Sequence, residues 1–272
     1  MRFSQCIKNS YVRYSKYAIV PVFLAAGIPT LLAAPAQPLR SPWDGKPVKS
    51  TDTPYACPAI AHLTPDLVTD GFYRLDDPTH SIIDPVRQEA YRKSSGKVKQ
   101  VGMEIVKAAD DYRTTGSREA AQCAMAQIIV LAQEHSLTGR MSSNQAYYVQ
   151  GWVAGAIAIA YLKIRETGFA TSKQEKVIAA WLQTIGDQTK NYYDSRANSK
   201  NNHLYWAGVE LAAIGVVADN PNDFQWAIEA YDTGVDNIQP DGTLPLEMAR
   251  GKRAVHYHLY ALAPLVLIAE FG

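Results

Sequence analysis

Two short stretches of the sequence carry side chains that are suited to chemistry. The first is Asn201-Asn202-His203-Leu204-Tyr205-Trp206, which places two amides and an imidazole beside two aromatic rings. The second runs from Glu247 to His258 and holds three cations within four residues, followed by a tyrosine between two histidines. Amides, imidazoles and aromatic rings that face a groove form a good surface for a sugar, and clustered cations suit an anionic ligand.

Each stretch also has an ordinary structural interpretation. Asn201 or Asn202 is a typical helix cap, and a lone His203 is often a structural histidine. The second stretch is also what the solvated basic start of a helix near Arg253 would look like. Cations at that end of a helix oppose the helix dipole, however, so their position favours a role in binding a ligand.

The residue types in the two stretches suit β-elimination of a uronic acid polymer. Loss of the C5 proton beside a carboxylate builds up negative charge, which an arginine and a neutral amide can stabilise. A tyrosine or a histidine can take the proton, and a phenol can protonate the departing O4. The sequence has no Gly-x-Ser-x-Gly elbow, phosphate loop or zinc-type cysteine pair. No carboxylate or thiol is spaced to complete a metal site with His203, His256 and His258, so we expect no metal and no cofactor.

The order and spacing of these motifs resemble the bacterial alginate lyases of polysaccharide lyase family five, the poly(β-D-mannuronate) lyases. The resemblance rests on Asn201-Asn202-His203-x-Tyr205-Trp206, then Leu246-Glu247-x-Ala249-Arg250-Gly251, then His256-Tyr257-His258. It covers roughly residue 55 to the end of the chain.

The resemblance implies a catalytic set of Asn202, His203, Arg250 and Tyr257. Asn202 and Arg250, helped by His203, would neutralise the substrate carboxylate. Tyr257 would act as the acid and, for mannuronate, as the base too, while His203 is the alternative base for the opposite stereochemistry. A lid loop from Tyr73 to Asp84 is expected over the groove. The residues expected to contact the substrate are Tyr73, Lys99, Gln145, Tyr148, Trp152, Tyr205, Trp206 and His256.

The elements that must position these residues are helices, because hardly any alternating strand pattern follows Pro85. Short connections between consecutive helices imply antiparallel neighbours, in a bundle, a solenoid or a toroid. The resemblance selects an all-α, incomplete (α/α) toroid of antiparallel helical hairpins with a deep substrate groove. The predicted helices are Pro85–Lys93, Lys97–Arg113, Ser117–His135, Asn144–Arg165, Ser172 to about Ala197 with a Ser172–Glu175 capping box, His203–Val217, Asp223–Asn237 and Arg253–Glu270.

The first 36 residues have the plan of a cleavable secretory signal, with a basic segment, the apolar run Ala18–Leu32 and the small residues Ala34-Pro35-Ala36. An irregular segment, residues 37–70, and an alginate-lyase-like domain, residues 71–272, would follow. Because family members usually continue beyond Gly272, we expect this domain to be truncated. The location implied is periplasmic or secreted. No later stretch is apolar enough to cross a membrane, so we expect no stable membrane insertion.

Composition limits the partners of the chain. The 272 residues are 47% apolar and 19% charged, which is enough apolar material for one folded domain. The 27 basic and 26 acidic residues become 23 and 26 once the signal is removed, which argues against a general nucleic-acid binder. We expect a monomer whose partner is an anionic polysaccharide.

The cysteines agree with export. Cys6 lies in the signal, which leaves Cys57 and Cys123 in the mature protein. Two cysteines in an oxidising compartment most simply form one disulfide, which would join the segment before residue 65 to a helix near residues 117–136. The alternative is two separate buried thiols.

The function predicted is a lyase that cleaves β-1,4-linked polyuronate, with alginate or poly-mannuronate as the leading substrate and 4,5-unsaturated uronate ends as products. The alternatives are a lyase for glucuronan or a glucuronate-containing exopolysaccharide, and a non-catalytic polyuronate-binding protein. A toroidal glycoside hydrolase that uses Asp241 and Glu247 is a further alternative.

Overall fold

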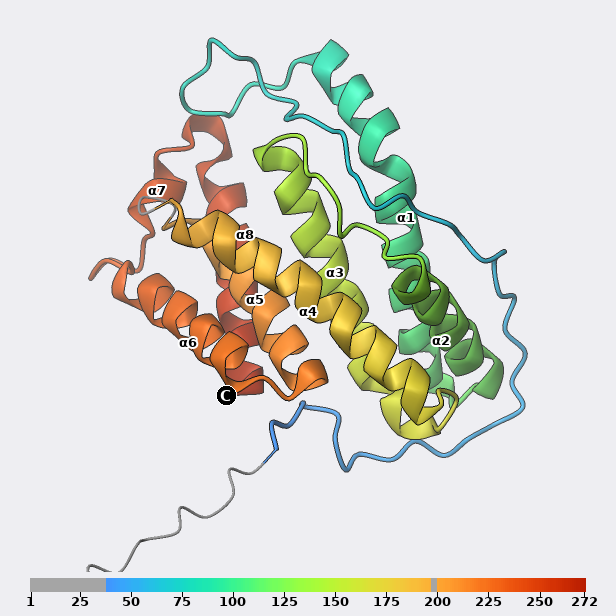
Figure 1. The fold of residues 1–272 in the computed structure, drawn as a ribbon. Coiled ribbons are helices and arrows are strands. Elements are labelled where there is room, and N and C mark those ends of the chain that lie inside the picture. The colour runs from blue at the N-terminus through green and yellow to red at the C-terminus, as the bar shows by residue number, and fades with distance from the viewer. Residues whose placement is uncertain (1–37, 197–199) are drawn as a thin grey trace, which may run out of the picture. The chain divides into compact units, whose positions relative to one another are not determined.

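A computed structural model describes residues 38–196 and 200–272 (Figure 1). The predicted signal, residues 1–36, lies outside the described residues. Helices dominate the described part, which confirms the all-α prediction. They are α1 Pro85–Thr115, α2 Arg118–Gln133, α3 Asn144–Ile164, η1 Arg165–Thr167, α4 Ser172–Asp194, α5 Asn202–Ala218, α6 Pro221–Asp236, α7 Pro245–Met248, η2 Gly251–Arg253 and α8 Ala254–Phe271.

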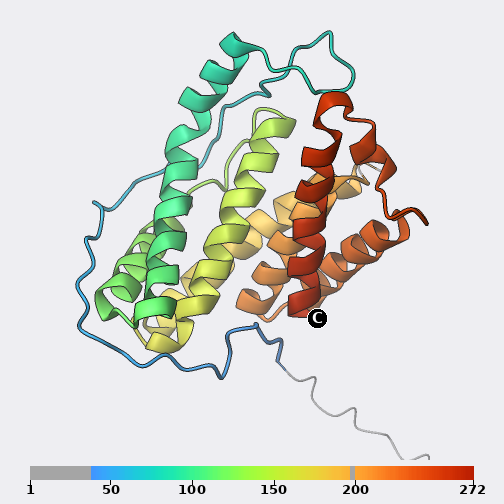
Figure 2. The same ribbon diagram turned by 180° about the vertical axis from the view of Figure 1, so that it is seen from behind.

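The helices form two layers. α1, α3, α5 and α8 pack against one another in that order, and α2, α4 and α6 pack on the outer side of this row (Figures 1 and 2). α3 and α5 have buried residues on most of their surfaces, because each touches neighbours in both layers. α3 is therefore central, and the candidate site residues at the start of α5 lie beside it.

The first helix differs from the prediction of two helices separated near residue 95. α1 is continuous through Ser94, Ser95 and Gly96, three residues that favour a break. The Ser95 hydroxyl donates to the Tyr91 carbonyl at 2.7 Å, and Ser95 is fully buried. The polar group is thus satisfied within the helix, so burial of this turn in the core outweighs its weak helix propensity.

Helix ends were predicted to within a few residues. The capping box of α4 is formed by Thr171 and Gln174, one residue earlier than the predicted pair. Gly116 and Gly168 follow helices in the left-handed conformation, with φ of 79° and 72°. α4 ends at Asp194, before the predicted Ala197, which lies outside the described residues.

The chain before α1 has no helix among the described residues and runs along the outside of the helices (Figures 1 and 2). It is attached to them through Cys57, which forms a disulfide with Cys123 of α2. The single-disulfide interpretation is therefore confirmed. Isolated bridges pair Thr51 with Ser117 and Leu67 with Met141.

One helix of the described residues, Gly251–Phe271, is long and apolar enough to cross a membrane by length and composition. The expectation that no stretch after the signal qualifies is therefore wrong. Tyr257, Ala261 and Ile268 of this helix are buried in the protein. Apolar helices of protein cores have the same composition.

Candidate active site

His203 lies at the start of α5, against aromatic rings of α3. Its ring stacks on Tyr148 at a centroid distance of 3.8 Å and an interplanar angle of 12°, and the Trp152 ring lies 6.2 Å away. Burial, and then the charges of Arg250 and His80, lower the pKa of His203 to about 3. The imidazole is therefore neutral at physiological pH. Its Nδ1 is buried and has no hydrogen-bond partner among the described residues.

Tyr257, in α8, lies between an arginine and a second tyrosine. The guanidinium carbon of Arg250 is 3.6 Å from the centroid of the Tyr257 ring, and the Tyr257 hydroxyl contacts the hydroxyl of Tyr73. Burial, and then the hydrogen bond with Tyr257, raise the pKa of Tyr73 well above its usual range. Tyr73 therefore keeps its proton and can donate a hydrogen bond to the Tyr257 oxygen. Such a donor and a nearby cation stabilise negative charge on that oxygen.

Tyr73 is the first residue of the lid loop, residues 73–84. This loop extends from the start of α1 towards the start of α8 (Figure 2). The buried Asp77 organises it by accepting five hydrogen bonds from backbone and side-chain groups of Thr79, Ser81 and Ile82. The hydrogen bond from the Thr79 hydroxyl is the leading cause of a pKa of Asp77 well below its usual range. Asp77 is therefore ionised at neutral pH.

Arg250 connects the lid loop to Tyr257. Its Nε donates to the carbonyl of Thr79 and its Nη2 donates to the carbonyl of His80, each at 2.8 Å. His80 has a φ of 47°, in the left-handed region that residues other than glycine rarely adopt. The guanidinium is thus held by lid-loop carbonyls on one side and lies against the Tyr257 ring on the other.

Asn202, the first residue of α5, is fully buried. Its Nδ2 donates to both carboxylate oxygens of Glu247 at 2.9 Å, and its backbone N–H donates to Glu247 Oε1 at 2.7 Å. The predicted direct contact between Asn202 and a substrate carboxylate is therefore not available in this structure, because the side chain has no exposed surface and is bonded to Glu247.

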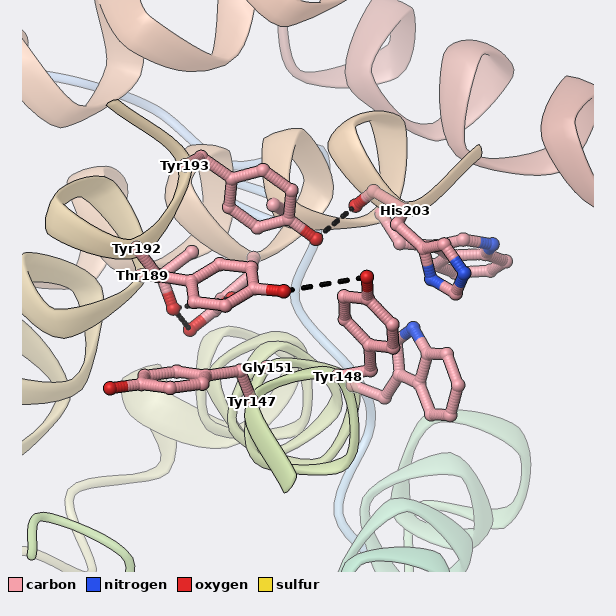
Figure 3. Close-up of a pocket in the computed structure, with 11 residues that line it drawn as sticks. Tyr147, Tyr148, Gly151, Thr189, Tyr192, Tyr193 and His203 are labelled. Carbon is pink, nitrogen blue, oxygen red and sulfur yellow. Dashed lines mark hydrogen bonds between the residues drawn. The ribbon is translucent and has the colours of Figure 1, made fainter. Parts of the chain in front are cut away.

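A small pocket next to His203 is lined mainly by aromatic residues (Figure 3). The Tyr193 hydroxyl donates to the carbonyl of His203 at 2.9 Å, and the Tyr192 hydroxyl donates to the Tyr148 hydroxyl at 3.4 Å. These contacts connect the end of α4 to the starts of α3 and α5. They therefore fix the ring on which the imidazole stacks.

The same pocket contains a buried acid, Glu210 of α5. Its only hydrogen-bond partner among the described residues is the hydroxyl of Thr189, at 3.0 and 3.1 Å from the two carboxyl oxygens. A Cβ on Gly151 would lie 2.5 Å from Glu210 Oε2, so the glycine allows α3 and α5 to approach closely here. Burial raises the pKa of Glu210 to about 8, which keeps the group mostly protonated at neutral pH.

The other residues expected to contact the substrate have varied surroundings. Gln145 has a buried Nε2 without a partner among the described residues. The Trp206 indole donates to the Tyr260 carbonyl at 3.2 Å. His256 is exposed, with its ring parallel to that of Tyr260 at 6.2 Å. Lys99 lies on α1 with its Nζ 4.9 Å from the centroid of the Tyr91 ring.

The prediction that Tyr205 contacts a sugar is wrong. Tyr205 is 1% exposed and packs with Leu244, Ala261 and Leu265 in a small apolar cluster. Its hydroxyl donates to the Lys200 carbonyl at 3.2 Å. Because Ala261 and Leu265 belong to α8, Tyr205 is part of the packing of α5 against α8.

Glu210, Asp77 and the pairing of Glu247 with Asn202 were not predicted. Glu210 stands alone between Val209 and Leu211 in an apolar helix, and such an isolated acid is a sequence signal for a buried carboxyl. No comparable signal identifies the partner of Glu247, because the pair is separated by 45 residues.

The three histidines weighed as metal ligands gain no support. Within residues 38–196 and 200–272, no three His, Cys, Asp or Glu side chains form a group that would hold a metal ion. The site thus combines a neutral imidazole, a paired tyrosine and an arginine, with aromatic rings around them.

Comparison with known proteins shows that the chain is similar to proteins named as alginate or polysaccharide lyases. The family model described as alginate lyase matches residues 71–272. A polysaccharide lyase of Stenotrophomonas maltophilia is 37% identical over 220 residues, which make up 80% of this chain and 65% of that protein. An alginate lyase of Pseudomonas fluorescens is 30% identical over 267 residues, which make up 94% of this chain and 72% of that protein.

The fold is shared with a solved structure, the crystal structure of alginate lyase A1-III from Sphingomonas species A1. The TM-score is 0.67 at 24% identity, over 80% of this chain and 62% of that one. This likeness confirms the predicted incomplete (α/α) toroid. The chain spans less than two-thirds of the length of several of the relatives that it matches.

Proposed function

The chain belongs to the alginate lyase family, and from that premise we propose that it is a polysaccharide lyase that cleaves β-1,4-linked polyuronate by β-elimination. Alginate, and poly-mannuronate within it, is the substrate that we propose. The product carries a 4,5-unsaturated uronate at its new non-reducing end. Relatives named alginate lyase across most of this chain support the proposal.

The single observation that carries the proposal is the convergence of Tyr257, Arg250 and Tyr73. In the proposed reaction the Tyr257 oxygen acts as a phenolate that takes the C5 proton, and the resulting phenol gives a proton to the departing O4. The Arg250 guanidinium, 3.6 Å from the Tyr257 ring, stabilises the phenolate before the transfer and the negative charge that then develops at the substrate carboxylate. The Tyr73 hydroxyl, which stays protonated, donates to the Tyr257 oxygen when that oxygen carries negative charge.

His203 is suited to assist because it is neutral. A pKa of about 3 keeps its imidazole neutral at neutral pH, so one ring nitrogen can donate a hydrogen bond and the other can accept one. We propose that it contacts the uronate at the reacting centre and that it is the alternative base for the opposite C5 stereochemistry. Asn202 completes the set through its position next to His203.

A hydrolase mechanism that uses two carboxylates is disfavoured by the surroundings of Glu247. That side chain is 1% exposed and its oxygens accept hydrogen bonds from Asn202, so it cannot reach a glycosidic oxygen. The other candidate, Asp241, is exposed and accepts hydrogen bonds from Thr243 in a turn. The phenol-based mechanism uses Tyr257, which contacts Arg250 and Tyr73.

We also propose that residues 1–36 are a cleaved export signal and that the enzyme acts in the periplasm or outside the cell. The disulfide between Cys57 and Cys123 supports an oxidising compartment. The proposed partner is the anionic polysaccharide itself, which a monomer can bind through Arg250 and the aromatic residues near His203.

The test is the ultraviolet absorbance of the unsaturated uronate when the purified protein is mixed with poly-mannuronate, poly-guluronate or glucuronan. We expect a rise with poly-mannuronate. Tyr257→Phe should lower kcat by at least about 100-fold, because it removes the proton shuttle. Tyr231→Phe, in the partly buried part of α6, is the matched control and should keep full activity. No rise with any polymer, from a protein that folds and binds polyuronate, would replace the lyase with a binding protein.

A further inference from the structure

Glu247 is a buried carboxylate whose position is explained by neither packing nor an ion pair. It is 1% exposed, and among the described residues no Lys or Arg nitrogen is within salt-bridge distance of it. A buried charge is costly unless hydrogen bonds compensate it. Here the compensation comes from one residue, Asn202, which donates three hydrogen bonds of 2.7 to 2.9 Å.

The hydrogen bonds to Glu247 determine the orientation of the Asn202 amide. Both carboxyl oxygens of Glu247 accept from Asn202 Nδ2, so the amide nitrogen must face them. The amide oxygen then faces away, and Asn202 Oδ1 is indeed buried without a hydrogen-bond partner among the described residues. If the amide were reversed, two acceptors would face each other and both donors of Nδ2 would lose their partner. The orientation is therefore set by chemistry.

Glu247 also connects the two segments that carry the proposed catalytic residues. Asn202 immediately precedes His203, at the start of α5. Glu247 lies in α7, and its carbonyl accepts the backbone N–H of Arg250 at 3.1 Å. One side chain thus fixes the position of the His203 segment relative to the Arg250 segment, although the two are far apart in the sequence.

We propose that Glu247 is a positioning residue of the lyase reaction: its carboxylate orients the Asn202 amide and holds His203 in register with Arg250. This role rests on the proposed function. Because Glu247 has almost no exposed surface, it acts through Asn202 and His203 and does not touch the substrate.

Glu247→Gln tests the role with little change of volume. The new amide N–H would face the Asn202 nitrogen, so at least one of the side-chain bonds must be lost or the Asn202 amide must turn. A displacement of a catalytic group by about 1 Å can cost about 100-fold in rate. We therefore expect kcat on poly-mannuronate to fall by about 10- to 100-fold, with KM changed less than about threefold.

Asp223→Asn is the matched control. Asp223 is also fully buried and also accepts side-chain hydrogen bonds, from Gln183 and Lys190, but it lies on α6 and is not among the residues that line the pocket next to His203. This variant should lower the thermal midpoint and leave kcat unchanged. If Glu247 had only a structural role, Glu247→Gln would likewise lower the thermal midpoint and leave kcat unchanged. The ratio of kcat loss to stability loss therefore separates a positioning role from a structural one.

Glu247→Asp provides a second measurement, should the glutamine variant fail to fold. It keeps the charge with a shorter side chain, so we expect a kcat between those of the wild type and Glu247→Gln. The role is overturned if Glu247→Gln stays within about threefold of wild-type kcat, or if the aspartate recovers no activity relative to the glutamine. A wild-type protein without activity overturns the proposed function and, with it, this role; an active wild type with an equally active Glu247→Gln overturns the role alone.

Discussion

The stability of this protein should depend on pH in both directions, because two uncharged titratable groups, the half-buried His203 and the buried Glu210, line one pocket. Glu210 has its pKa raised from 4.5 to about 8, chiefly by burial. His203 has its pKa lowered from 6.5 to about 3, again chiefly by burial. Glu210 therefore binds its proton more tightly in the folded state than in the unfolded state, and His203 binds it less tightly.

The sign of each effect follows from linkage. Between pH 4.5 and 8 the folded state keeps the proton of Glu210 and the unfolded state loses it, so the free energy of unfolding falls as pH rises. Between pH 6.5 and 3 the unfolded state takes up a proton on His203 and the folded state does not, so this free energy falls as pH drops. The two slopes cancel between pH 4.5 and 6.5, where this pair makes stability greatest.

The alkaline loss is large enough to measure. At about 1.4 kcal/mol per pH unit, Glu210 alone lowers the free energy of unfolding by up to about 4 kcal/mol between pH 5 and pH 8. Natural domains have about 5–15 kcal/mol in total. Glu210→Gln removes the titration but keeps the shape and a partner for Thr189. The variant should therefore match the wild type at pH 5 and exceed its stability by up to about 4 kcal/mol at pH 8.

The assay is urea denaturation followed by circular dichroism at pH 5, 6.5 and 8. Glu229→Gln, an exposed glutamate of α6, is the matched control and should show the pH dependence of the wild type. Parallel curves for Glu210→Gln and the wild type across this range would refute the argument, because they would mean that Glu210 is ionised in the folded protein.

Three further outcomes are expected. Asp77→Ala removes the acceptor of five lid-loop hydrogen bonds, so kcat/KM on poly-mannuronate should fall by about 10-fold or more. Steady-state kinetics indistinguishable from the wild type would show that the lid loop does not need Asp77. Gly151→Ala places a Cβ 2.5 Å from Glu210 Oε2, so the free energy of unfolding should drop by about 1–3 kcal/mol, a result that an unchanged urea midpoint would contradict. Cys57→Ser opens a loop of 66 residues, which should cost about 4 kcal/mol; equal stability of the wild type and the variant would argue against this chain-entropy account.

Much of the helical framework could be read from local sequence. Asn201 caps α5, Pro85 and Pro221 begin helices, and Gly116 and Gly168 end them, because these residues satisfy or relax the backbone at a helix terminus. The same local reasoning was wrong at Ser95. A serine that bonds to its own helix and is buried by neighbours has a tertiary explanation, which local propensity does not contain.

Motifs in the sequence predict a set of candidate site residues, but they do not predict the contacts among these residues. His203, Arg250 and Tyr257 were identified from motifs, and the structure brings them together with Tyr73 of the lid loop. The exposure of each residue was not predictable in this way. Asn202 and Tyr205 stand in the same motif as His203, yet both are buried, because on one helix turn only some side chains face away from the core.

Three acids, whose surroundings were not predicted, explain why the site has this form. A neutral His203 requires burial, burial requires the close packing of α3 on α5, and this packing places Glu210 where its charge is suppressed. Asp77 and Glu247, in contrast, accept several hydrogen bonds each. Asp77 organises the lid loop, which holds Tyr73, and Glu247 holds the start of α5, which carries His203. One acid is thus kept uncharged in the aromatic pocket, while two carboxylates orient the lid loop and the start of α5. The chemistry of the site therefore depends on carboxyl groups that do not react.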